Sequence, residues 1–287
     1  MLKWFKQMGK WADLHVHTTA SDGALTPTEV VLEAERVQLT AVGIADHDTV
    51  DGIDEALTVA EDCTVEVVPA IEISATHNTT EVHILGYFID HHNEQLVEEM
   101  RFLRKARLER ARLMVEKLRS IGVPVEFDRV VEIARGGAIG RPHVARAIYE
   151  VGAASSLDAA FGKFLQAGGP AYVPRPKVTP GHAIDLIIHA GGVPCCAHVA
   201  KLRHDELILK LKDVGLAGIE VYHPDHPPAA IRFYKRFAER HGLIAVGGSD
   251  AHYLPGSVSS GIGSVVVGYD VVERLKSLSE DTRQRRP

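Results

Sequence analysis

Short apolar runs alternate with helical patterns over the first third of the chain. The runs predicted to be strands span residues 12–17, 41–45, 66–73 and 83–88. Between the first two runs, Thr26-Pro27-Thr28-Glu29 predicts the start of a helix. Thr26 suits the N-cap, Pro27 suits the first helical position, and Glu29 can complete a capping box. Strands that alternate with helices are typical of a parallel sheet, which we expect to close as a barrel.

This alternation stops near residue 94. Residues 94–135 read as one long arginine-rich helix, with Gly122 near its end and Pro124 beyond it, and shorter helical stretches follow to about residue 167. The β/α pattern resumes at Thr179-Pro180, and later strands are predicted at 193–198, 218–222 and 243–247. The expected organisation is an α/β barrel over 11–98 and 176–275, a helical insertion that caps the substrate site over 99–175, and a polar, frayed tail over 276–287.

The overall composition is that of an ordinary globular protein. Of the 287 residues, 45% are hydrophobic and 24% are charged. No run of about 18 apolar residues exists and residues 1–10 are too polar for a signal peptide, so we expect a cytoplasmic protein without a membrane segment. The odd number of cysteines fits a reducing compartment, and Cys195 and Cys196 lie in an apolar run that predicts core positions. The net charge of -6 argues against a long nucleic acid as partner.

Histidine changes this picture, because the chain has 16 of them. In Asp13-Leu14-His15-Val16-His17 two imidazoles stand two residues apart on a predicted strand. Side chains at this spacing point to the same face of a strand, so both rings can bind one metal ion. The carboxylate of Asp22, just downstream, offers a ligand to a second ion.

Further histidines and carboxylates recur near the ends of the later predicted strands. They are His47, Glu72, His83, His198, Asp250 and His252. α/β barrels build their active sites at the carboxyl ends of their strands, and core packing gives no reason for such residues there. Nine ligands exceed what a single ion takes, and mixed nitrogen and oxygen ligands suit Mn, Fe or Zn better than Mg or Ca.

These motifs resemble those of the PHP-domain phosphoesterases, a branch related to the metal-dependent amidohydrolases. The matching stretches are Asp13–His17, Ser21-Asp22-Gly23, Asp46-His47-Asp48, Glu72, His83, Ala197-His198 and Ser249-Asp250-Ala251-His252. The resemblance covers about 11–98 and 176–270. Within the family, the chain is most similar to enzymes with a helical insertion that remove the 3′-phosphate from nucleoside 3′,5′-bisphosphates. Some of their relatives trim short RNA from the 5′ end. Val199 departs from the pattern, since proline is more common after this histidine.

The resemblance implies a distorted (β/α)7 barrel and three divalent ions, with Mn as the first expectation and Fe or Zn as alternatives. By this resemblance, His15, His17, Glu72 and Asp250 would hold the first ion. Glu72 would bridge to a second ion, which His83 and His198 complete. Asp22, His47 and His252 would hold the third. Glu72, Asp250 and His252 are the residues that we expect to act in catalysis.

The expected reaction is in-line attack on phosphorus by a hydroxide held between two ions, which lie about 3.5–4 Å apart in such sites. Arg141 and His143, in Gly140-Arg141-Pro142-His143, are the best candidates to hold the substrate phosphate, because arginine grips phosphate through two hydrogen bonds. Weaker candidates, each equally well explained without a substrate, are Lys163, Arg175, Lys201, His223 and His226. Asp13, Asp46 and Asp48 stand next to ligands, where they would either orient a histidine ring or shape a loop.

Other functions remain open at the level of sequence. The main alternative is a phosphatase of another small phosphoester such as histidinol phosphate, since metal ligands alone do not separate these branches. A non-catalytic metal-binding PHP module, of the kind attached to DNA polymerases, is the alternative from another class. The insertion with Arg141 favours a small phosphorylated nucleotide or a short oligonucleotide as substrate. The sequence does not predict an oligomeric state.

Overall fold

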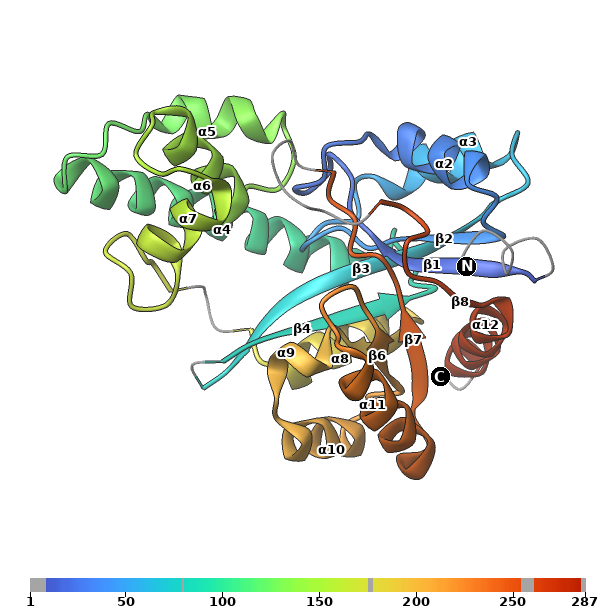
Figure 1. The fold of residues 1–287 in the computed structure, drawn as a ribbon. Helices are drawn as coiled ribbons and strands as arrows, with labels where there is room; N and C mark the ends of the chain where they lie inside the picture. The colour runs from blue at the N-terminus through green and yellow to red at the C-terminus, as the bar shows by residue number, and fades with distance from the viewer. Residues whose placement is uncertain (1–8, 79, 175–177, 254–260, 285–287) are drawn as a thin grey trace.

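A computed structural model describes residues 9–78, 80–174, 178–253 and 261–284 of the chain (Figure 1). Its strands are β1 (Trp11–Val16), β2 (Ala41–Ile44), β3 (Glu66–His77), β4 (Thr80–Tyr87), β5 (Val193–Cys196), β6 (Gly218–Tyr222), β7 (Ile244–Gly247) and β8 (Val267–Gly268). Its helices before the fifth strand are α2 (Pro27–Arg36), α3 (Ile53–Ala60), α4 (Glu94–Ser120), α5 (Phe127–Ala134), α6 (Arg141–Glu150), α7 (Leu157–Ala160), the π-helical turn η2 (Phe161–Leu165) and α8 (Pro180–His189). The later helices are α9 (Val199–Leu202), α10 (Asp205–Asp213), α11 (Pro228–His241) and α12 (Tyr269–Gln284).

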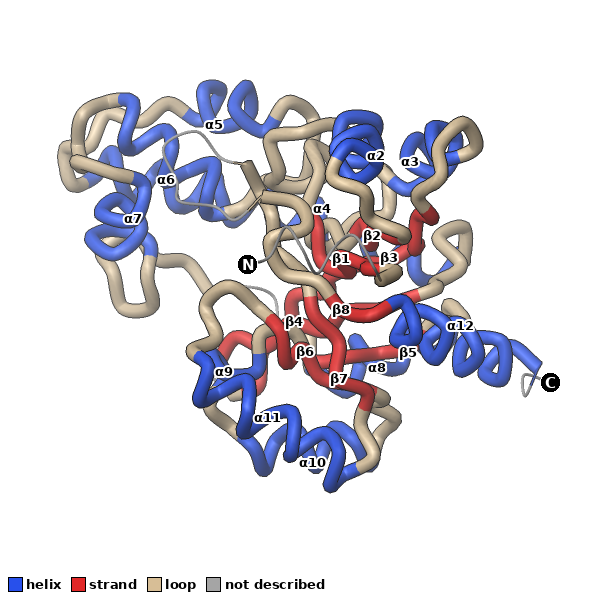
Figure 2. Tube along the Cα trace, turned by 45° about the vertical axis from the view of Figure 1, so that its right-hand side comes forward, coloured by secondary structure: helices blue, strands red, loops and turns tan. Residues whose placement is uncertain are grey.

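All eight strands join one sheet in the order β7-β6-β5-β4-β3-β2-β1-β8. The sheet is nearly closed, because Val16 at the end of β1 bridges Ala251 just after β7. Helices cover its outer side, as the tube of Figure 2 shows. β1 to β7 form the barrel, and the short β8 adds an antiparallel pair with β1. The predicted α/β barrel of the PHP type is confirmed.

One strand does not follow the predicted parallel arrangement. β4 is antiparallel to both β3 and β5, so the sheet is mixed. His77 pairs with Thr80, which makes β3 and β4 a hairpin. A parallel pair needs a crossover of a dozen or more residues, whereas hairpin partners must run in opposite directions. As a result, the first half of β4 lies at the same edge of the barrel as the carboxyl ends of the other strands.

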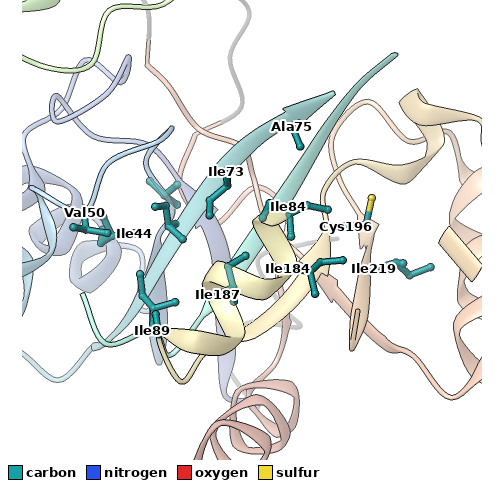
Figure 3. Close-up of a cluster of buried hydrophobic side chains, with 14 of the residues drawn as sticks. Ile44, Val50, Ile73, Ala75, Ile84, Ile89, Ile184, Ile187, Cys196 and Ile219 are labelled. Carbon is teal, nitrogen blue, oxygen red and sulfur yellow. The ribbon is translucent and has the colours of Figure 1, made fainter. Parts of the chain in front are cut away.

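The core has two layers, on the two faces of the sheet. The larger layer lies between the strands and the outer helices, where Ile184 and Ile187 of α8 face Ile73 and Ile84 (Figure 3). The second layer collects side chains from the opposite faces of the strands, among them Leu14, Leu85 and Tyr87. Because neighbouring residues of a strand alternate in direction, the two layers share every strand.

The two adjacent cysteines follow this alternation. Cys195 belongs to the second layer and Cys196 to the larger one, and both are fully buried. Burial raises the pKa of Cys196 to about 12, so its thiol stays protonated at neutral pH. The prediction that both are core residues is confirmed.

The inserted helices form a unit beside the barrel with a core of their own (Figure 1). α4 belongs to both parts: Leu96 and Met100 pack in the larger barrel layer, whereas Met114 and Leu118 pack against α5 and α6. The boundary expected at residue 99 therefore falls inside a continuous helix. This helix ends at Ser120 and a separate helix begins at Phe127, so 94–135 is not one helix.

Residues 276–284 of the predicted frayed tail are helical, and residues 285–287 lie outside the described part of the chain. α12 continues to Gln284, and Val272, Leu275 and Ser279 form its buried face. The hydroxyl of Ser279 reaches the carbonyl oxygens of Phe88 at 3.2 Å and of Gly191 at 2.6 Å. Contact with the barrel thus compensates for the polar composition of this segment. Among the helices of the described residues, none is long and apolar enough to cross a membrane.

Candidate metal centre and active site

The nine predicted ligands lie together at one mouth of the barrel. His15 is the fifth residue of β1, and His17 follows the strand directly. Glu72 lies on β3, and His198, Asp250 and His252 lie in the loops after β5 and β7. His83 reaches this mouth because β4 runs antiparallel, which places the first half of that strand there. The hairpin that departs from the predicted sheet therefore contributes a ligand.

The first group of ligand atoms comes from His15, His17 and Asp250, with Glu72 beside the two histidines. Nε2 of His15 lies 3.1 Å from Nε2 of His17 and 3.3 Å from Oε2 of Glu72. Oδ1 of Asp250 lies 3.5 Å from the same His15 nitrogen and 3.1 Å from Nε2 of His17. A tetrahedral ion with ligands at about 2.0–2.2 Å sets neighbouring ligand atoms about 3.3–3.6 Å apart. His15, His17 and Asp250 thus have the spacing to hold one ion, and Oε2 of Glu72 lies within 3.4 Å of both histidines.

Glu72 is the common partner of the remaining imidazoles. Its Oε1 lies 2.7 Å from Nδ1 of His83 and 3.2 Å from Nε2 of His198, and its Oε2 lies 2.9 Å from Nδ1 of His47. The side chain is 1% exposed. Burial would raise the pKa of Glu72, but the charges of His47, His83 and His15 lower it well below its usual value. The carboxylate is therefore held ionised, with both oxygens directed at different ligand groups.

A further group lies on the other side of His17. Ligand atoms of His17, Asp22, His47 and His252 all lie within 4.8 Å of one another. Nε2 of His252 is 3.4 Å from Oδ1 of Asp22, and the rings of His17 and His252 are stacked with centroids 4.0 Å apart. Burial would lower the pKa of His252, but Asp22 raises it to about 10. A further cation, the third of the predicted set, would lie among His17, Asp22, His47 and His252, where the charges of Asp22 and His252 now compensate each other.

Unpaired polar atoms provide the test of whether metal ions fit. Besides the hydroxyl of Tyr87, the buried atoms of the described residues without a hydrogen bond include Nδ1 of His17, Oδ1 of Asp22, Nδ1 of His47 and Oε2 of Glu72, which face one another only as ion pairs. Leaving one such atom unsatisfied costs about 1–3 kcal/mol. All four belong to predicted ligands, and imidazole nitrogens with carboxylate oxygens are the donors that divalent transition metals take. The residues present fit a metal centre.

Glu220 supports this centre and was not among the predicted residues. Its Oε1 lies 2.9 Å from Nδ1 of His15, and its Oε2 accepts a hydrogen bond of 2.6 Å from the backbone N–H of His198. Burial would raise the pKa of Glu220, but His15 lowers it. A carboxylate behind a ligand histidine fixes the tautomer and the direction of the ring. The signal in the sequence is a glutamate inside the otherwise apolar run Gly218–Tyr222. The side chain of this glutamate is fully buried in the structure.

The three aspartates beside the ligands shape the loops. Asp13 accepts hydrogen bonds from the backbone N–H groups of Ser249 and Gly263, and Asp46 accepts from the backbone and hydroxyl of Thr18. Asp48 accepts from the backbone N–H of Ser74 at 2.7 Å. Of the two roles considered for them, these contacts match loop shaping, whereas Glu220 and Glu81, which are not predicted ligands, contact the rings of His15 and His83.

Arg107 of α4 joins the insertion to the ligand-bearing loops. Its Nε donates to Oδ2 of Asp48 at 2.6 Å, and its second guanidinium nitrogen donates to the hydroxyl of Ser74 at 3.0 Å. Both partners lie within two residues of a predicted ligand, His47 or Glu72. Arginine and aspartate are both buried here, so the pair is well shielded from water.

A cavity of about 450 Å³ opens beside the ligand cluster. Glu72, His83, His198 and Asp250 contribute to one part of its wall, and Arg141 and Lys201 contribute to another. The guanidinium of Arg141 donates to Oε2 of Glu81 at 2.6 Å, and Nζ of Lys201 lies 2.8 Å from Oδ2 of Asp225. Two of the predicted phosphate-binding cations thus face the same cavity as the metal ligands.

The other substrate candidates lie elsewhere. Nδ1 of His143 accepts from the backbone N–H of Gly140 at the start of α6, and its side chain faces an adjoining cavity of about 270 Å³ that Asp22 also lines. Nζ of Lys163 donates to the carbonyl of Ala153, away from the described lining of the larger cavity. Arg175 lies outside the described residues.

The two histidines after β6, His223 and His226, use both ring nitrogens in contacts with other groups of the protein. Nε2 of His223 lies 3.1 Å from Oδ2 of Asp250, and its Nδ1 accepts from the backbone N–H of Asp225. Nδ1 of His226 contacts the carbonyl of Val221, and its Nε2 accepts from the backbone N–H of Ala200. With both ring nitrogens occupied, His223 orients a predicted ligand and His226 joins β6 to α9, so the geometry does not favour either as a substrate contact.

Comparison with known proteins agrees with this geometry. Residues 13–121 match the family model described as PHP domain. The 3′,5′-nucleoside bisphosphate phosphatase of Chromobacterium violaceum is 34% identical over 257 residues, which are 88% of this chain and 90% of that protein. The 5′-3′ exoribonuclease Rnm of Escherichia coli is 34% identical over 84% of each chain.

A solved structure gives the same result. The crystal structure of a protein from Bifidobacterium adolescentis, described as a metal-dependent phosphoesterase, superposes with a TM-score of 0.87 at 33% identity. The match covers 93% of this chain and 96% of that chain. Fold, ligand cluster and relatives therefore agree that the chain belongs to the PHP family of metal-dependent phosphoesterases.

Proposed function

We propose that the protein removes the 3′-phosphate from nucleoside 3′,5′-bisphosphates and also acts on short 5′-phosphorylated oligonucleotides. The observation that carries the proposal is one cavity lined by both the ligand cluster and Arg141. Its volume of about 450 Å³ lies in the range of sites for small ligands. The names of the relatives from Chromobacterium violaceum and Escherichia coli support a substrate of this class.

The proposal assigns three divalent ions to the ligand cluster, with Mn expected. His15, His17, Glu72 and Asp250 would hold the first, Glu72 with His83 and His198 the second, and Asp22, His47 and His252 the third. When bound, such ions lower the pKa of water and neutralise negative charge that builds on phosphoryl oxygens. Glu72, Asp250 and His252 would take part in catalysis as ligands of the ions next to the reacting phosphate.

The remaining work falls to the protein's own side chains. Arg141 would turn from Glu81 to the substrate and donate two parallel N–H groups to a phosphate. Glu220 holds the ring of His15, and His223 holds the carboxylate of Asp250, so the ligands keep their directions while the substrate binds. Such orientation before binding avoids reorganisation during the reaction. We also propose that the insertion over 99–175 covers the substrate, since α6 supplies Arg141 to the cavity.

The first prediction concerns metal and substrate together. Protein treated with EDTA should lose hydrolysis, and Mn should restore it, because the ligand cluster lacks a nucleophile of its own. Phosphate release with Mn should be fastest for a nucleoside 3′,5′-bisphosphate in a screen that includes a 5′-phosphorylated dinucleotide, histidinol phosphate and a cyclic phosphate. Full activity of the metal-free protein would contradict the requirement for metal ions. Faster release of phosphate from histidinol phosphate would contradict the proposed nucleotide substrate.

The second prediction concerns Arg141. Arg141→Ala should raise KM for a nucleoside 3′,5′-bisphosphate at least about tenfold, because two charge-assisted hydrogen bonds to the phosphate are lost. KM for a generic aryl phosphate should rise less, because that substrate has a single phosphate. Steady-state kinetics with both substrates tests this, and Arg274→Ala on the exposed face of α12 is the control. Equal increases in KM for the two substrates would contradict the assignment.

The third prediction concerns Glu220. Glu220→Gln should lower the affinity for Mn by about 10–100-fold, because the amide does not stabilise the same orientation of His15. The Mn concentration that gives half-maximal activity and direct titration of the protein with Mn should shift together. Glu239→Gln, exposed on α11, is the matched control. An unchanged Mn affinity would show that Glu220 has only a structural role.

A further inference from the structure

The cavity beside the ligand cluster has an apolar part that phosphate chemistry does not need. Phe161, Val82 and Leu202 line it together with the charged residues. Among the described residues of this lining, Phe161 is the only phenylalanine, tyrosine or tryptophan. Cations bind phosphate, whereas an aromatic ring offers a flat apolar surface. The ring therefore indicates that the substrate carries, besides its phosphates, a flat or apolar group that the protein recognises.

The backbone around Phe161 is unusual. Phe161 begins the π-helical turn η2, in which the N–H of Gln166 donates to the carbonyl of Phe161 at 3.0 Å. Such turns are rare and frequently lie at functional sites. Phe164 and Leu165 of the same turn are buried in the core of the insertion, whereas Phe161 is only partly buried. The wide turn thus anchors two side chains and leaves Phe161 at the cavity.

A charged neighbour covers the ring of Phe161 until it turns to the substrate phosphate, as proposed above. The guanidinium of Arg141 lies over the ring, 4.8 Å from its centroid. Glu81 holds this guanidinium at 2.6 Å and also lies 2.9 Å from Nε2 of His83, a predicted metal ligand. Ring, guanidinium and ligand cluster are therefore linked by direct contacts. Because one cavity is lined by both the metal ligands and Phe161, a substrate whose phosphate lies near the ligands can present another group to the ring.

We propose that Phe161 is the platform on which the base of a nucleotide substrate packs, and so makes the enzyme prefer nucleotides to phosphoesters without a base. This inference rests on the proposed function, and adds to it the residue that recognises the base. Stacking of a base on an aromatic side chain is favourable for every base, because each has a π face. The platform therefore selects nucleotides as a class and does not read the identity of the base.

The test compares two substrates that differ only in the base. One is adenosine 3′,5′-bisphosphate, and the other is the abasic ribose 3,5-bisphosphate in which hydrogen replaces adenine. Wild-type enzyme with Mn should prefer the nucleotide in kcat/KM. In Phe161→Leu this preference should fall about tenfold, mainly through a higher KM for the nucleotide. Phe161→Tyr, which keeps the ring, should restore the preference.

The controls separate recognition from folding. Phe102→Leu, at an exposed position of α4, should keep the preference of the wild type. Equal loss of activity on both substrates in Phe161→Leu, or no change in the preference, would overturn the platform. A wild-type enzyme that treats the two substrates alike would also overturn it and leave the proposed function intact. Release of phosphate from neither substrate would refute the proposed function itself, and the platform with it.

Discussion

The structure depends on one buried carboxylate that is surrounded by imidazoles. Glu72 contacts His15, His17, His47, His83 and His198 within 3.4 Å and is almost fully buried. An ionised carboxylate in the interior is tolerated only when opposite charge compensates it. Partly protonated histidines can provide that charge, and so can divalent cations. One buried oxygen of Glu72 and the buried Nδ1 atoms of His17 and His47 make no hydrogen bond, which favours cations as the functional partners.

The rest of the fold keeps these groups in place. The hairpin of β3 and β4 pairs His83 with Ser74 and so brings its ring within 2.7 Å of the carboxylate of Glu72, two residues away on β3. Glu220 fixes His15 from behind, and Asp13 ties the loop after β7 to the first strand. Arg107 reaches from α4 to Asp48 and so joins the insertion to the loop that carries His47. The insertion therefore supplies both Arg141 to the cavity and a buried connection to the ligand loops.

Much of the site could be predicted because metal binding requires particular residue types near strand ends. His15, His17 and Asp250 follow that logic, and the structure places them within 3.5 Å of one another. Sequence reasoning was less successful where tertiary contacts decide. The prediction of parallel strands was wrong at β4. The short gap between the predicted strands 66–73 and 83–88 leaves no room for a crossover helix and could have indicated a hairpin. The role of Glu220 depends on a contact with His15, 205 residues away. Residues 276–284 looked like a tail because they are polar, and Ser279 is the one among them that is buried. His226 looked available because its partners are backbone atoms.

The most direct test of the account is the metal content of Glu72→Gln. Glutamine keeps the size of the side chain but removes the charge that the imidazoles and cations share. Purified wild-type protein loaded with Mn and freed of excess metal should retain more than one equivalent by elemental analysis. Glu72→Gln, with an unchanged circular dichroism spectrum, should lose at least one equivalent together with its phosphate release. Retention of the wild-type metal content and activity by Glu72→Gln would contradict the central role of this carboxylate.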